Sequence, residues 1–138
     1  MTVFLDTDIL LDVLAKREPF FKDSMRMFDL CESARIKGAV SALSLCTLAY
    51  VLRKSTTQSQ MKNTLRALRN VLNIVDTSGN IINRAIDSAL SDFEDAVQFF
   101  SAVHCGADYI VTRNVKHFPS DTVPALTPAA FLALRQGQ

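Results

Sequence analysis

The chain has 138 residues, of which 49% are hydrophobic, and a formal net charge of +1. This length suits one domain, expected over residues 1–138, and the four glycines and four prolines argue against a disordered or fibrous chain. The longest uncharged run, 38–52, is too short for a membrane span, and the N-terminus lacks the basic leader of a signal peptide. We therefore expect a cytoplasmic globular protein.

The three cysteines, Cys31, Cys46 and Cys105, are widely spaced and include no C-x-x-C pair. This pattern indicates neither a disulfide framework nor a zinc site. Each cysteine lies on an apolar face of its segment, so we expect all of them to be small core residues.

The chain opens with an apolar run, residues 2–5, that predicts a buried strand. Asp6 follows it directly, at the carboxyl end where open α/β sheets place their ligands. A charge in this position is costly unless a metal ion, a cation or several hydrogen-bond donors satisfy it. Asp6 is therefore the first candidate functional residue.

The later segments alternate between helical and strand patterns. We expect helices beginning at 7, at 19 (stopped by Gly38), at 43, after 57, at 79, at 93 and at 128, and strands at 39–41, 72–76, 109–112 and, at an edge, 123–126. Such alternation requires right-handed crossovers and a parallel sheet covered on both faces. The predicted fold is a three-layer α/β/α sandwich around a mostly parallel sheet of four to five strands.

Several polar residues should meet where the parallel strands end. Asp6 follows the first strand, Asn114 follows the fourth, and Asp92 and Asp95 open the helix that leads into the fourth strand. Positions three apart share a helix face, so Asp92 and Asp95 should point together, whereas Glu94, rotated by about 100°, should face elsewhere. Carboxylate and amide oxygens suit Mg²⁺ or Mn²⁺.

Each of these residues also has an ordinary structural explanation. Asp92 can cap its helix, Asn114 suits a turn, and acids near a helix N-terminus are favoured by the helix dipole. Only their convergence at one edge favours a functional site.

Four motifs, taken in order, resemble the PIN domain, the nuclease fold of VapC-type toxins of bacterial toxin–antitoxin pairs and of related RNA-processing enzymes. The motifs are Phe4–Leu11, Val40–Leu43, Glu94–Val97 and Ile110–Asn114. The resemblance covers nearly the whole chain, and the order of the motifs carries it because each one is short.

The resemblance implies a metal-dependent nuclease site that uses Mg²⁺ or Mn²⁺. Asp6 and Asp95 would be metal ligands, with Asp92 as a companion acid one turn before Asp95. Thr112 would supply a hydroxyl at the end of its strand, and Asn114 would occupy a position that is often Asp in the family.

Two positions depart from the family pattern. The helix after the second strand usually carries a metal-site Glu, where this chain has Thr47 and no acid nearby. Asp8 stands where Asn or Ser is common. The missing carboxylate should weaken metal binding, and Asp8 would either restore some charge or cap the following helix.

RNA is the substrate that the resemblance implies, and one part of the chain is basic enough to bind it. Between Ser33 and Val75 there is no acidic residue. The candidate RNA contacts are Arg53, Lys54, Lys62 and Arg66, with Arg69 on the same stripe, and Arg113 beside the acids. This basic surface could equally be solvated, or bind an antitoxin or a second protomer.

The expected function is hydrolysis of RNA phosphodiester bonds by a toxin that has an antitoxin partner and forms a homodimer. One alternative is a PIN fold that has lost catalysis and binds RNA or protein. A less favoured one is a haloacid-dehalogenase-type phosphohydrolase, whose first motif also has Asp-x-Asp; here Ile9-Leu10 replaces the residues that should follow.

Overall fold

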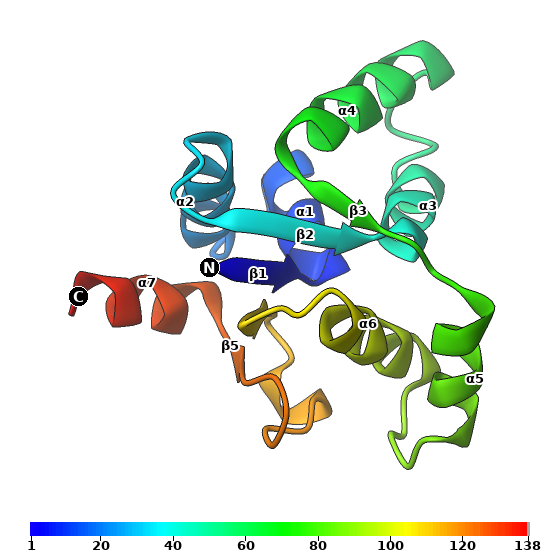
Figure 1. Cartoon of the computed structure of the whole chain (residues 1–138). Coiled ribbons are helices and arrows are strands. Elements are labelled where there is room, and N and C mark those ends of the chain that lie inside the picture. The colour runs from blue at the N-terminus through cyan, green and yellow to red at the C-terminus, as the bar shows by residue number, and fades with distance from the viewer. Residues whose placement is uncertain (138) are drawn as a thin grey trace.

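The computed structural model describes residues 1–137, and a sheet of five parallel strands lies at its centre (Figure 1). The strands are β1 (Thr2–Leu5), β2 (Lys37–Ser41), β3 (Asn73–Val75), β4 (Tyr109–Val111) and β5 (Ala125–Leu126), in the order β3-β2-β1-β4-β5. All neighbouring pairs are parallel, which confirms the predicted α/β fold. β5 is an edge strand, as the proline before it predicts.

Within residues 1–137, seven α-helices and one 3₁₀ turn connect the strands. They are α1 (Thr7–Leu14), α2 (Phe21–Glu32), α3 (Ala42–Val51), α4 (Gln58–Val71), α5 (Gly79–Asp87), α6 (Phe93–His104), the turn η1 (Val115–His117) and α7 (Pro128–Gln136). Most helices begin at a side chain that accepts a hydrogen bond from a backbone N–H of the first turn, which stabilises their starts. These capping residues are Asp6, Ser41, Thr57, Ser78, Asp92 and Thr127.

Helices cover both faces of the sheet. Val3 and Leu5 point to one face and belong to a core shared with α1, α2, α3, α4 and α7. Phe4 points to the other face and packs with residues of α6, against which α5 lies. Val3, Phe4 and Leu5 are fully buried, as a central parallel strand requires.

The strand ends bring distant parts of the chain together at one edge. Leu5 pairs with Val111, and the Asp6 N–H donates to the Val111 carbonyl at 3.0 Å. The next residues, Asp6 and Thr112, are therefore neighbours. The arrowheads of β1 and β2 in Figure 1 both point to the side where α3 begins.

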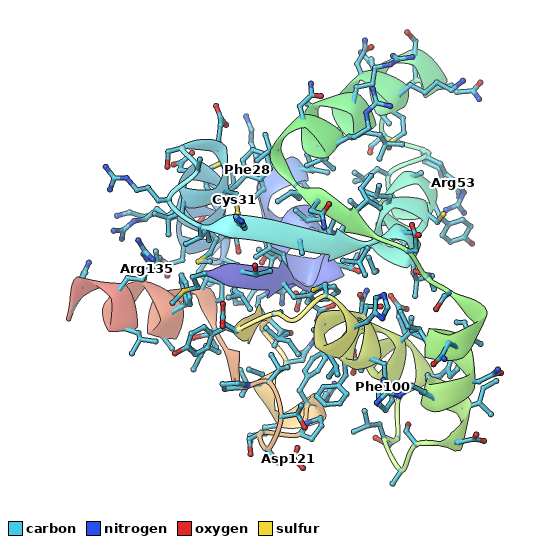
Figure 2. The ribbon with its side chains drawn as sticks, in the orientation of Figure 1. Phe28, Cys31, Arg53, Phe100, Asp121 and Arg135 are labelled. Atoms are coloured by element: carbon cyan, nitrogen blue, oxygen red, sulfur yellow. The ribbon has the colours of Figure 1, made fainter. Side chains whose placement is uncertain are left out.

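Gly38 does not stop a helix, and that prediction is wrong. α2 ends at Glu32, and Gly38 lies inside β2. A Cβ atom at this position would lie 2.5 Å from the Cys31 Sγ and 2.6 Å from the Leu72 Cδ2. The glycine is needed because α2 and the end of α4 approach the strand closely, with Cys31 between α2 and β2 (Figure 2).

Two other expectations concern burial and membranes. Cys31 is buried, but Cys46 is exposed, so the core prediction is wrong for that residue. Across residues 1–137, no helix combines the length and apolarity that a membrane crossing requires.

Candidate metal centre

A pocket of about 270 Å³ lies at the edge where the strands end. Its lining residues come from the start of α1, from α3, from the start of α6 and from the segment after β4: Asp6, Thr7, Asp8, Leu11, Thr47, Asp92, Glu94, Asp95, Asn114 and His117. Four of the predicted site residues, Asp6, Asp92, Asp95 and Asn114, thus line one pocket. Thr112 lies behind Asp6 and is fully buried.

Asp6 is 6% exposed and is held by two hydrogen bonds. The Thr7 N–H donates to its Oδ1 and the Thr112 hydroxyl to its Oδ2, each at 2.8 Å. Burial, followed by the nearby charge of Asp8, raises the pKa of Asp6 to about 7, although the two hydrogen bonds oppose this rise. Asp6 is therefore a well-oriented carboxylate that lacks a compensating positive charge.

Asp8 uses only one of its oxygens. Its Oδ2 accepts from the Arg113 N–H at 3.2 Å and from the Asn114 Nδ2 at 3.4 Å. Its Oδ1 is buried and has no hydrogen-bond partner among the residues that the structure describes. Burial raises the pKa of Asp8, whereas the hydrogen bond and the positive charge of Arg113, together with the nearby Ile9 N–H, lower it. Asp6, not Asp8, caps α1.

The first turn of α6 carries the remaining acids. Asp92 caps the helix, because its Oδ1 accepts from the Asp95 N–H at 2.9 Å. Burial raises the pKa of Asp95, and a hydrogen bond with His117 opposes this change. Glu94 also lines the pocket, so the expectation that it faces elsewhere is wrong. Glu94 lies in the first turn of α6, where no earlier turn of the helix stands between its side chain and the pocket.

His117 also lies at the site, although no motif in the sequence marks it. Its Nδ1 is 2.8 Å from the Asp95 Oδ2, and its side chain is 55% exposed. The 3₁₀ turn η1 follows Asn114 directly and brings His117 back over the pocket. The sequence pattern did not indicate this turn, so it did not predict the contact between His117 and Asp95.

A buried polar cluster joins the three helices that surround the pocket. The Thr7 and Ser44 hydroxyls lie 2.6 Å apart, and the Gln98 Nε2 donates to both, at 3.0 and 2.8 Å. Ser44 and Gln98 are at most 1% exposed. Thr47, one turn after Ser44, lines the pocket without a charge.

Arg113 is held by the protein itself. Its Nε donates to the Asp12 Oδ2 at 2.9 Å, and its guanidinium lies 4.1 Å from the centre of the Phe20 ring. Asp12 is fully buried and also accepts from the Ser24 hydroxyl at 3.1 Å. These contacts fasten the segment after β4 to α1 and α2.

The other candidate RNA contacts lie outside the pocket. Arg53, Lys54, Lys62 and Arg66 are all exposed, on α4 and around the end of α3. Arg53 stacks on Tyr50, 3.9 Å from its ring centre, and projects from the outer end of α3 (Figure 2). Lys62, Arg66 and Arg69 border a separate groove of about 280 Å³.

The donor set fits a hard divalent cation in its chemistry. Carboxylate oxygens predominate, burial followed by repulsion from neighbouring carboxylates raises the pKa values of Asp6, Asp8 and Asp95, and the Asp8 Oδ1 lacks a partner among the described residues. As they stand, however, no three His, Cys, Asp or Glu side chains in residues 1–137 are arranged to hold a metal ion. Metal binding would need adjustment of side chains such as Asp95, which now contacts His117.

The chain belongs to the PIN-domain family, because the family's model matches residues 2–116. This membership confirms the resemblance found in the sequence and contradicts the haloacid-dehalogenase alternative. The comparison with curated proteins found no match.

Solved structures of VapC-type proteins share the fold. A toxin–antitoxin complex from Klebsiella pneumoniae has a TM-score of 0.68 at 22% identity, covering 91% of this chain and 97% of that one. VapBC2 from Rickettsia felis, bound to a promoter DNA fragment, has a TM-score of 0.67 at 19% identity, covering 92% and 98%. Mycobacterium tuberculosis VapC20, described as a sarcin-ricin loop cleaving toxin, has a TM-score of 0.60 at 16% identity, covering 87% and 92%.

Proposed function

We propose that this protein is an Mg²⁺- or Mn²⁺-dependent endoribonuclease and the toxin of a toxin–antitoxin pair. One observation carries the proposal: Asp6 is a buried, firmly held carboxylate in a pocket that it shares with Asp8, Asp92 and Asp95. Asp6 is buried, and Asp8 and Asp95 are half-buried, so keeping these carboxylates ionised side by side is costly without a cation. The cleavage of an RNA loop by the similarly folded VapC20 supports RNA as the substrate class.

Each residue of the site would have a distinct task. Asp6 and Asp95, with Asp92 beside them, would hold the ion, which when bound would polarise the scissile phosphate and lower the pKa of an attacking water. Thr112 orients Asp6 through its hydroxyl and also accepts from the Asn114 N–H at 3.0 Å. Asp92 fixes the first turn of α6 and so the position of Asp95.

RNA would approach across the basic surface of α3 and α4. The exposed basic side chains on this surface can contact the phosphates of an RNA backbone: Arg53, Lys54, Lys62 and Arg66. Arg113 would act mainly by holding the segment after β4, because Asp12 already takes its Nε. Its partly exposed side chain would still add positive charge beside the acids.

The protein partners are an antitoxin and a second copy of the chain. The similar structures from Rickettsia felis and Klebsiella pneumoniae are complexes of a toxin with its antitoxin. We extend this arrangement to the present protein on the basis of its fold and family.

A PIN fold that binds RNA or protein without cleaving is the second candidate function. Thr47 favours it, because this pocket position carries no charge. The contact between His117 and Asp95 favours it too, since it occupies an oxygen that a metal would need.

Cleavage of RNA by the purified full chain distinguishes the two candidates. We expect cleavage with Mn²⁺ or Mg²⁺, none in EDTA, and a loss of at least about 100-fold in Asp6→Asn and Asp95→Asn. Glu32→Gln, which removes an exposed acid at the end of α2, should behave as wild type. Equal cleavage by wild type and Asp6→Asn would contradict the proposal, and RNA binding without cleavage under any metal would establish the binding function.

A further inference from the structure

We propose that Asp8 is a further metal ligand of this pocket and that its Oδ1 is the donor atom. The inference rests on the proposed function, because the ion is the one that the nuclease reaction requires. The ligands named above are Asp6, Asp95 and Asp92, so Asp8 adds a position on α1.

The hydrogen bonds of the pocket acids single out Asp8. Both oxygens of Asp6 accept hydrogen bonds, Asp92 accepts from the Asp95 N–H, and Asp95 contacts His117. The Asp8 Oδ1 is buried and has no partner among the described residues, and the side chain is 15% exposed. The Asp12 Oδ1 and the Gln98 Oε1 are likewise buried without a partner in this part of the chain, but neither residue lines the pocket. A buried carboxylate oxygen without a donor needs an explanation, and a cation supplies one.

Asp8 is also held in a fixed orientation. Its Oδ2 accepts from the Arg113 N–H and the Asn114 amide, and Arg113 is in turn fixed by Asp12. Asp6 and Asp8 both lie at the start of α1, and the negative charge of Asp8 raises the pKa of Asp6. A cation between the two carboxylates would relieve this repulsion.

On the α3 side of the pocket, Thr47 brings no charge. On the α1 side, Asp6 and Asp8 at the start of the helix both bring negative charge. If Asp8 served only to fasten the segment after β4, its Oδ2 would suffice. The unpartnered Oδ1 is what the fastening role leaves unexplained.

Binding of Mn²⁺ alone, without RNA, tests this inference. Titration calorimetry and thermal melts would compare the full-length wild type with Asp8→Asn, and with Glu94→Gln as a matched loss of one charge at the same pocket. We expect Asp8→Asn to weaken Mn²⁺ binding at least about tenfold and Glu94→Gln by less than about threefold. Without metal, Asp8→Asn should melt no earlier than wild type, because it removes a carboxylate that repels Asp6 while its amide oxygen can still accept from the Arg113 N–H; a merely structural Asp8 would lower the melting temperature.

A charge exchange gives a second variant. The Asn114 Nδ2 lies 3.4 Å from the Asp8 Oδ2, so the double variant Asp8→Asn, Asn114→Asp moves the carboxylate within this contact and keeps the net charge. It should recover most of the affinity that Asp8→Asn loses.

The outcomes separate this inference from the proposed function. Mn²⁺ binding by Asp8→Asn equal to that of wild type, or weakened no more than in Glu94→Gln, overturns the role of Asp8 alone. A wild type that does not bind Mn²⁺ overturns both proposals.

Discussion

Asp6 combines a high desolvation cost with firm positioning. Burial and the charge of Asp8 favour its protonated form, whereas the Thr7 N–H and the Thr112 hydroxyl favour the ionised form. The result is a pKa of about 7, close to physiological pH. A bound divalent cation would shift the balance toward the carboxylate, so metal binding and proton release should be linked.

The metal-free protein should become more stable as the pH falls from about 8 to about 5.5. The pKa of Asp6 is raised from 3.8 to about 7 in the folded state, so between these values the folded protein keeps a proton that the unfolded chain has lost. The free energy of unfolding therefore decreases as the pH rises through about 7.

Thermal melts in EDTA across this pH range measure the effect. Asp6→Asn, which cannot ionise, should show a smaller dependence on pH than wild type. An identical dependence in the two proteins would show that Asp6 is not the group responsible.

Thr47→Glu should strengthen Mn²⁺ binding by about tenfold or more, because it places a carboxylate on the pocket wall. Thr47→Gln is the matched control, since it has nearly the same size and no charge. Calorimetric titration of both variants gives the comparison, and equal affinities for Mn²⁺ would contradict the expectation.

At the scale of helices and strands, the site depends on three helix starts held in register. The cluster of Thr7, Ser44 and Gln98 ties α1, α3 and α6 together next to the pocket. Since Asp6 precedes Thr7 and Asp95 lies one turn before Gln98, this cluster fixes the distance between the two proposed ligands.

Ser44→Ala should lower the free energy of unfolding by about 1–3 kcal/mol, because it leaves buried partners of Ser44 with fewer hydrogen bonds. Ser101→Ala is a matched control: Ser101 is also fully buried, but its hydroxyl only donates to the Val97 carbonyl of its own helix. Urea unfolding would measure both variants. A loss in Ser44→Ala no larger than in Ser101→Ala would contradict a special role for the cluster.

The sequence predicted the elements and the edge at which Asp6, Asp95 and Asn114 meet, because apolar runs and the geometry of parallel strands are local or general signals. It did not predict the contacts of His117, Gln98 or Arg113. Those contacts join segments that are far apart in the chain, and a polar residue within a helix gives no sign of a buried partner. The role of Gly38 was missed for the same reason, since only packing against Cys31 and Leu72 demands a glycine there.

At the scale of the whole molecule, charge is separated between an acidic pocket and the basic surface of α3 and α4. The net charge of +1 conceals this division, since no acid occurs between Ser33 and Val75. A polyanion held by the basic surface could present a phosphate to the pocket only with a cation there to offset the acids.

Lys62→Ala with Arg66→Ala should weaken RNA binding and reduce its dependence on salt, by a slope of up to about 2 for two lost phosphate contacts. The measurement uses the Asp6→Asn background, so that RNA stays intact. Lys22→Ala with Arg26→Ala removes the same charge from α2 and should have a smaller effect. Equal effects of the two pairs would mean that RNA binding depends on net charge and not on this surface.

The most direct test of the account examines the ends of RNA fragments made by the purified protein with Mn²⁺. Attack by water on the phosphodiester, as in metal-dependent hydrolysis, predicts fragments without a 2′,3′-cyclic phosphate, formed by wild type and absent with Asp6→Asn or EDTA. Cyclic phosphate ends, cleavage that persists in EDTA, or equal cleavage by Asp6→Asn would contradict the account.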